Sequence, residues 1–109
     1  MALHDEFARH IIDSSLIARL HRTNGLELIG QAEIDGNEPA TLSADAAIRH
    51  ADRAIVVFRE ALGLLPDLTA AFEVKRSGDI ALLESGWALV AARRKLGPHN
   101  TVEVRPSNM

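Results

Sequence analysis

The stretch from Ser77 to Ala92, SGDIALLESGWALVAA, says most about the fold of this 109-residue chain. Ser77-Gly78-Asp79 is typical of a hairpin turn. Residues 80–92, which follow it, are apolar at odd and at even positions alike. We interpret residues 80–92 as a long strand with two apolar faces.

An antiparallel strand usually leaves one polar face in water. Because both faces of residues 80–92 are apolar, both must be covered. We expect helices to cover one face of residues 80–92 and a second copy of the chain to cover the other. This predicts a homodimer through the outer face of the sheet. The alternative is a central strand that bends around the protein's own core.

The segments on the N-terminal side extend this sheet. Residues 68–75 alternate between two sets of side chains, as a half-buried strand does. The same alternation over residues 26–34, followed by the turn sequence Asp35-Gly36-Asn37, predicts a second strand. Residues 38–42 are expected to pair back as a short strand, although Pro39 disfavours it.

Helices are predicted between and before these strands. The strongest helical pattern runs from Ala44 to Leu62, with Ser43 as its N-cap. Two shorter helices are predicted over residues 4–12 and 15–21, separated by helix-capping residues at Asp13-Ser14-Ser15.

Length and composition indicate one domain, residues 1–109, with a last strand over residues 101–105 and a frayed tail over residues 106–109. The net charge of −3 does not support a nucleic-acid-binding surface. The absence of cysteine excludes disulfides, thiolate metal sites and a cysteine nucleophile. No apolar run approaches the ~20 residues that span a bilayer, and the first residues do not resemble a signal peptide. We therefore expect a cytoplasmic protein without membrane or nucleic-acid partners.

The order of these elements resembles the NTF2-like superfamily, in particular its SnoaL-like and ketosteroid-isomerase-like branches. Three segments carry the resemblance: residues 13–21, residues 37–49 and, as the best match, residues 77–89. The resemblance implies an α+β fold in which a cone-shaped, curved antiparallel sheet (cystatin-like) wraps around about three N-terminal helices. It also implies a pocket at the wide end of the cone and dimerisation through the outer sheet face.

Three side chains are candidates for catalysis in such a pocket. By the resemblance, Glu33 lies nearest the family's catalytic base and Asp35 lies close by. The alternative is that Glu33 faces water and Asp35 forms the turn. The third candidate, His21, is the last residue of the predicted helix over residues 15–21, where its alternative role is to cap the helix C-terminus. The usual isomerase mechanism also needs a tyrosine, which this chain lacks.

Apolar side chains are expected to line the pocket, with packing in the core or in a dimer interface as the alternative: Ile29, Phe58, Phe72 and Trp87. Glu84 lies within an apolar segment and is expected to be buried with a charged partner, Arg53 or Arg93. The five histidines show no metal-binding spacing, so we expect neither a metal nor a cofactor.

These features predict a small-molecule-binding protein of the NTF2-like, SnoaL-like kind, and they leave isomerase- or hydrolase-like activity open. The expected ligand is small and hydrophobic. The alternative is a non-catalytic, dimeric interaction or structural module in which side chains fill the cone.

Overall fold

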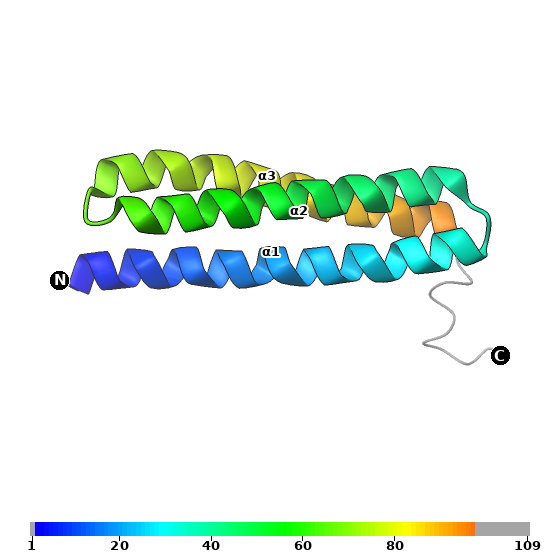
Figure 1. Ribbon diagram of the computed structural model, residues 1–109, viewed down its shortest axis with the longest axis horizontal. Helices are drawn as coiled ribbons and strands as arrows, with labels where there is room; N and C mark the ends of the chain where they lie inside the picture. Colours follow the sequence, from blue (N-terminus) through cyan, green and yellow to red (C-terminus); the bar gives the residue numbers. More distant parts are fainter. Residues whose placement is uncertain (1, 98–109) are drawn as a thin grey trace.

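The computed structural model describes residues 2–97, with side chains from Leu3 onward. These residues form three long α-helices joined by short loops: α1 (Ala2–Ile34), α2 (Glu38–Leu64) and α3 (Leu68–Leu96). Successive helices run in opposite directions and form a flat, elongated bundle with extents of 55 × 27 × 15 Å (Figure 1). Helix α2 packs along both α1 and α3, whereas α1 and α3 contact each other less.

The predicted α+β cone is therefore wrong, and so is the resemblance to the NTF2-like superfamily. That fold needs a curved sheet, and residues 2–97 contain helices and turns but no strand. The segments predicted as strands within this range lie in helices: residues 26–34 in α1, residues 38–42 in α2, and residues 68–75 and 80–92 in α3. The predicted strand over residues 101–105 and the predicted tail lie outside the described residues.

The functions that were predicted from the cone are therefore wrong as well. Neither a ligand pocket at the wide end of a sheet nor a cone filled by side chains exists in an all-helical bundle. A homodimer through the outer face of a sheet has no such face to use among residues 2–97.

Two helical stripes explain why residues 80–92 look apolar on both sides. One stripe is buried in the bundle and consists of Ala81, Ser85, Leu89 and Ala92. The other is exposed and consists of Ile80, Leu83, Trp87 and Val90. Side chains three and four residues apart share one face of a helix, so two opposite stripes together place apolar side chains at both odd and even positions. The composition of this segment therefore fits a helix as well as a two-sided strand.

Several residues that the sequence suggested as turns or helix ends lie inside helices. At two glycines, the neighbouring helix packs so closely that it leaves no room for a side chain. At Gly78 in α3, an added Cβ would lie only 2.6 Å from Cε1 of Phe58 in α2. At Gly25 in α1, it would lie 2.7 Å from Cγ1 of Ile48. Ser14 is buried within α1, which continues through it, so the predicted break between two short helices is wrong.

Side-chain caps fix the starts of α2 and α3, with Asn37 capping α2 and Asp67 capping α3. The predicted helix over residues 44–62 is confirmed as part of α2, but Asn37 caps it instead of Ser43. Asn37 Oδ1 accepts a hydrogen bond from the Ala40 N–H at 3.1 Å. Asn37 Nδ2 also donates to the Lys95 carbonyl at 2.7 Å, which joins the start of α2 to the end of α3.

The interior is built mainly from small side chains. Of the sixteen buried apolar side chains among the described residues, eleven are alanine. Fourteen of the sixteen lie in two clusters, one around Leu28 and Leu89 and the other around Ile11 and Phe58. Alanine allows helices to approach closely, but each buried CH₂ group contributes only about 0.8 kcal/mol, so alanine adds little stability by burial.

Gly30 provides a test of the helix over residues 26–34. It lies in α1, and an added Cβ would meet no atom within 4 Å. Replacing Gly30 with alanine is expected to raise the free energy of unfolding by roughly 0.5–1 kcal/mol, because alanine loses less backbone entropy in a helix. Urea unfolding followed by circular dichroism measures this change. An unchanged or lower stability would contradict a helix at this position.

Candidate functional site

The bundle exposes a row of four large apolar side chains on α3, formed by Ile80, Leu83, Trp87 and Val90, which we call the α3 stripe. Their side chains are 55%, 54%, 65% and 44% exposed. Single exposed apolar residues are common, but several in one row on a rigid element are typical of an interaction surface.

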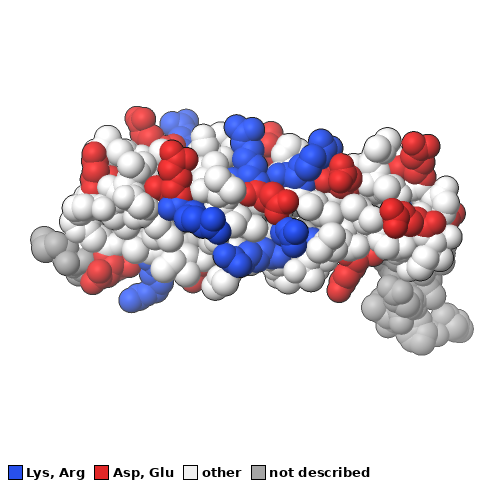
Figure 2. Space-filling view, in the orientation of Figure 1, with Lys and Arg blue, Asp and Glu red and all other residues white. Residues whose placement is uncertain are grey.

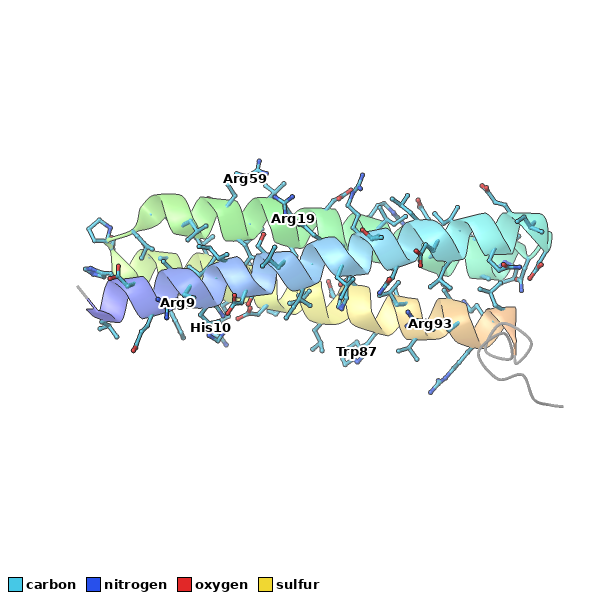
Figure 3. All side chains as sticks on the ribbon, turned by 90° about the horizontal axis from the view of Figure 1, so that it is seen from below. Arg9, His10, Arg19, Arg59, Trp87 and Arg93 are labelled. Atoms are coloured by element: carbon cyan, nitrogen blue, oxygen red, sulfur yellow. The ribbon has the colours of Figure 1, made fainter. Side chains whose placement is uncertain are left out.

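The α3 stripe is held outward by the packing of the opposite side of α3. Ser85 and Leu89 point into the bundle, so residues half a turn away from them must face outward. Figure 3 shows Trp87 pointing away from the bundle, on the side opposite Arg19 and Arg59. The stripe therefore lies on a different side from the surface that carries these arginines.

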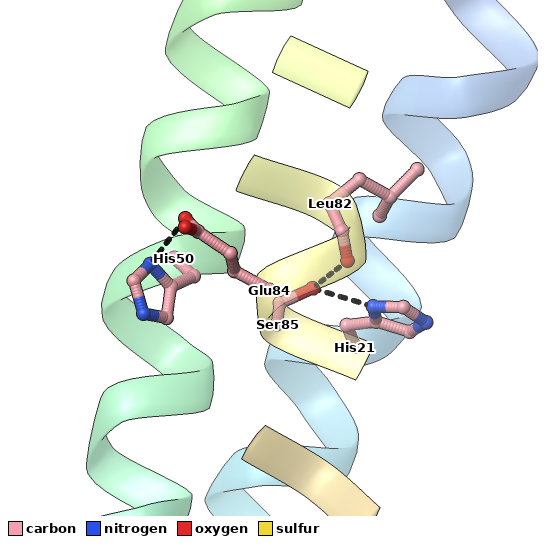
Figure 4. Close-up of polar contacts among 5 residues, drawn as sticks. All are labelled: His21, His50, Leu82, Glu84 and Ser85. Carbon is pink, nitrogen blue, oxygen red and sulfur yellow. Dashed lines mark hydrogen bonds and ion pairs between the residues drawn. The ribbon is translucent and has the colours of Figure 1, made fainter. Parts of the chain in front are cut away.

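Charged residues flank the α3 stripe. On one flank, Asp79 accepts a hydrogen bond from Lys75 Nζ at 2.7 Å, and Arg93 lies two turns beyond Gly86. On the other flank, Glu84 Oε1 lies 3.4 Å from Nδ1 of His50 in α2 (Figure 4). Glu84 is about half exposed, so the predicted burial with Arg53 or Arg93 is wrong.

A second candidate site is a polar contact between α1 and α3 (Figure 4). His21 Nδ1 lies 2.6 Å from Ser85 Oγ, which lies 2.7 Å from the Leu82 carbonyl oxygen. Since a carbonyl can only accept, the Ser85 hydroxyl donates to Leu82. His21 then carries a proton on Nδ1 and donates it to Ser85 Oγ.

This arrangement does not suit nucleophilic catalysis. A catalytic serine gives its proton to the histidine, whereas here the histidine donates to the serine. Ser85 is also fully buried, so a substrate has no access to its hydroxyl. The contact instead satisfies a polar group inside an apolar interior and ties α1 to α3.

Burial lowers the pKa of His21 below its ordinary value of 6.5, and the positive charge of Arg93 lowers it further. The unfolded chain therefore takes up a proton at a higher pH than the folded chain does. The contribution of His21 to stability is complete above about pH 6.5 and decreases as the pH falls towards the lowered pKa.

We accordingly expect the free energy of unfolding to fall when the pH is lowered from 7.5 to below 6. The variant His21→Asn keeps an N–H donor for Ser85 but does not titrate, so its pH dependence should be smaller. Urea unfolding of both proteins across this range measures the difference. Equal pH profiles for the two proteins would contradict the shifted pKa of His21.

Two grooves lie elsewhere on the surface. One, of about 370 Å³, lies between the first turns of α1 and α3 and is lined by Leu3, Phe7, Leu68, Thr69, Phe72 and Glu73. The other, of about 310 Å³, lies between α1 and α2 and has an apolar floor that includes Leu16 and Ile55, with Arg19 and Arg59 beside it. The space-filling view in Figure 2 shows Lys and Arg side chains gathered near the middle of one face, with Asp and Glu among them and toward both ends.

The predicted catalytic residues are not brought together. Glu33 is exposed near the end of α1, and Asp35 lies in the following loop, where it accepts a hydrogen bond from Gln31 at 3.1 Å. His21 lies in the middle of α1 and forms the contact with Ser85. A catalytic role for these three side chains stays a prediction from the sequence. They do not share a pocket among the described residues.

The residues predicted to line a pocket also lie apart. Phe58 is fully buried in one core cluster, and Ile29 packs against the other. Phe72 is exposed beside the groove at the end of the bundle, with its ring 6.1 Å from that of Phe7. Trp87 belongs to the α3 stripe.

Sequence reasoning missed Leu83 and Val90 as surface residues and Ser85 as a buried polar group. The signal for the stripe was present, because residues 80, 83, 87 and 90 have the spacing of one helix face. Nothing in the sequence alone indicated the contact between Ser85 and His21, which are 64 positions apart.

Among residues 2–97, no three His, Asp or Glu side chains gather closely enough to hold a metal ion. Of the described helices, none combines the length and apolar character needed to cross a membrane. Comparison of the chain with models of protein families, with curated proteins and with solved structures found no match.

Proposed function

We propose that this chain is a helix-docking protein module, whose α3 stripe binds an amphipathic helix of a protein partner. The observation that carries the proposal is the row of four large, exposed apolar side chains on α3. A partner helix with residues at the same three- and four-residue spacing would cover this row along its length.

The composition of the interior supports an interaction role. The chain keeps alanine inside and places large residues such as Leu83 and Trp87 outside. Covering one large apolar side chain contributes about 1.5–3 kcal/mol, more than an alanine contributes to the interior. Covering the α3 stripe would therefore add hydrophobic free energy that the bundle alone does not realise.

The chemistry of the stripe also indicates the kind of partner. Tryptophan is enriched at the centre of protein interfaces, and Trp87 is the most exposed member of the row. Arg76 and Arg94 continue the row at its two ends, where their charged groups reach solvent. The stripe thus has an apolar centre with a polar rim, as protein interfaces have.

Site-specific photo-crosslinking in cells tests this proposal. A photoreactive amino acid at position 87 should give a protein adduct, and the adduct should disappear when Leu83 is also changed to aspartate. The same probe at Val56, an exposed apolar residue of α2, is the matched control. Equal adducts at both positions, adducts to lipid only, or no adduct at position 87 would contradict a protein-docking α3 stripe.

A further inference from the structure

We infer that the partner of the α3 stripe is a second copy of this chain, bound through α3 with the two helices antiparallel. The inference rests on the proposed function and names its partner. It is carried by the symmetry of the stripe, by the charges beside it and by the small side chains inside the bundle.

The α3 stripe is symmetric about Ser85. Leu83 and Trp87 lie at equal distances along the helix from Ser85, and so do Ile80 and Val90. A two-fold axis at this point places Leu83 against the partner's Trp87 and Ile80 against the partner's Val90. Each layer then pairs two different side chains, and the same surface is used by both copies, as a two-fold interface requires.

The charges on one flank favour the antiparallel direction. Asp79 and Arg93 lie on the same side of the stripe, each seven residues from Gly86. Antiparallel pairing brings Asp79 near the partner's Arg93 twice, because of the two-fold axis. Parallel pairing would instead turn this flank toward the partner's opposite flank, which carries Glu84, so Asp79 and the partner's Arg93 would lie on different sides of the interface.

The opposite flank carries one unfavourable contact. Glu84 lies close to the two-fold axis, next to the partner's Glu84. Its contact with His50 at 3.4 Å draws the carboxylate toward α2 of its own chain. The variant Glu84→Gln is therefore expected to associate as tightly as the natural chain or several-fold more tightly.

The alanine-rich interior makes association and folding depend on each other. Because covering the stripe adds burial that the isolated bundle lacks, the temperature of unfolding should rise with protein concentration. Trp87 is the only tryptophan, so its emission reports directly on the centre of the interface. On dilution, the emission should shift to longer wavelength as the ring returns to water.

Sedimentation equilibrium combined with this dilution series tests the inference. The natural chain should sediment as a dimer, and Leu83→Asp should raise the dissociation constant about 100-fold or more, because the change occurs twice at the centre of the interface. Leu42→Asp, at an exposed leucine of α2, is the control and should leave the dimer intact.

The direction of pairing is tested with single cysteines, since the chain has none of its own. A mixture of Ile80→Cys and Val90→Cys proteins should form a mixed disulfide. Ile80→Cys alone should not, because ten residues of helix hold the two sulfurs about 15 Å apart, beyond the reach of a disulfide. Crosslinking of Ile80→Cys to itself would overturn the antiparallel arrangement.

Other outcomes separate this inference from the proposed function. A chain that is monomeric at every concentration, but still gives an adduct to another protein at position 87, overturns self-association and leaves the docking function standing. Masses that grow beyond a dimer indicate a head-to-tail contact between unlike surfaces and overturn the two-fold interface. A shift of Trp87 emission with lipid vesicles, but not with protein concentration, overturns both.

Discussion

Replacing Phe58 with alanine is expected to lower the free energy of unfolding by about 3–5 kcal/mol. Phe58 is fully buried and is the largest fully buried side chain among the described residues. Its neighbours in the core cluster include several alanines, which cannot expand into the space that the ring leaves. The cavity therefore persists and adds to the lost burial of the ring. Equilibrium unfolding in urea at one fixed protein concentration measures the effect.

Phe72 supplies the matched control. It is the same residue type on α3, but its side chain is 60% exposed. Phe72→Ala removes mainly its contact with the ring of Phe7 and should cost about 1 kcal/mol or less. Similar losses for the two variants would contradict the burial of Phe58 and the exposure of Phe72, and with them the assignment of the inner and outer sides of α2 and α3.

Gly78→Val is expected to lower the free energy of unfolding by about 3 kcal/mol. The first carbon added at this position would lie 2.6 Å from Cε1 and 2.8 Å from Cδ1 of Phe58. The ring is fully buried and cannot swing into solvent, so α2 and α3 must move apart to admit the valine. The lost packing spreads along both helices, because each is rigid.

A double-mutant cycle shows whether this cost comes from the contact with Phe58. In the variant Phe58→Ala, the cavity should accept the valine at position 78, so the double variant should lose clearly less stability than the two single changes added together. Gly30→Val in α1, where an added Cβ meets no atom within 4 Å, is the control and should change stability little. Additive losses in the cycle would contradict the close approach of Gly78 to Phe58.

The helix over residues 44–62 could be predicted because one repeating face decides it. The prediction used Ile48, Ala51, Ile55, Phe58 and Leu62, which recur at helical spacing; Ala51 and Phe58 are fully buried, and Ile55 and Leu62 pack against a core cluster. Its true start could not be predicted from Ser43, since Asn37 offers a better cap. The amide of Asn37 also bonds to the end of α3, which is distant in sequence.

Residues 4–12 and 15–21 were correctly predicted as helical, whereas residues 26–34 of α1 and residues 68–75 and 80–92 of α3 were mistaken for strands because apolar side chains alternate along them or fill both sides. In residues 68–75, Phe72 and Val74 suggested one apolar strand face. In the bundle, Ala71 is buried and Phe72 is exposed, so size does not indicate which side faces the core. Large apolar residues usually lie inside a protein. This expectation fails here, because the interior is built mainly from alanine.

The sequence suggested a second copy of the chain because residues 80–92 have two apolar sides. This reason still holds, although these residues form a helix instead of a strand. The bundle covers only the side that contains Ser85 and Leu89. The partner stays a proposal, but the surface that it would cover is now the α3 stripe instead of a sheet. The contact between His21 and Ser85 could not be predicted, because only the packing of α1 on α3 brings them together.

Residues 68–96 form one continuous helix with an apolar stripe on its outer side. The most direct measurement is the set of Cα chemical shifts of these residues by NMR in the natural chain. We expect helical deviations from random-coil values throughout α3, including Ser77-Gly78-Asp79. Strand-like deviations over residues 80–92, with a break at Ser77-Gly78-Asp79, would contradict it.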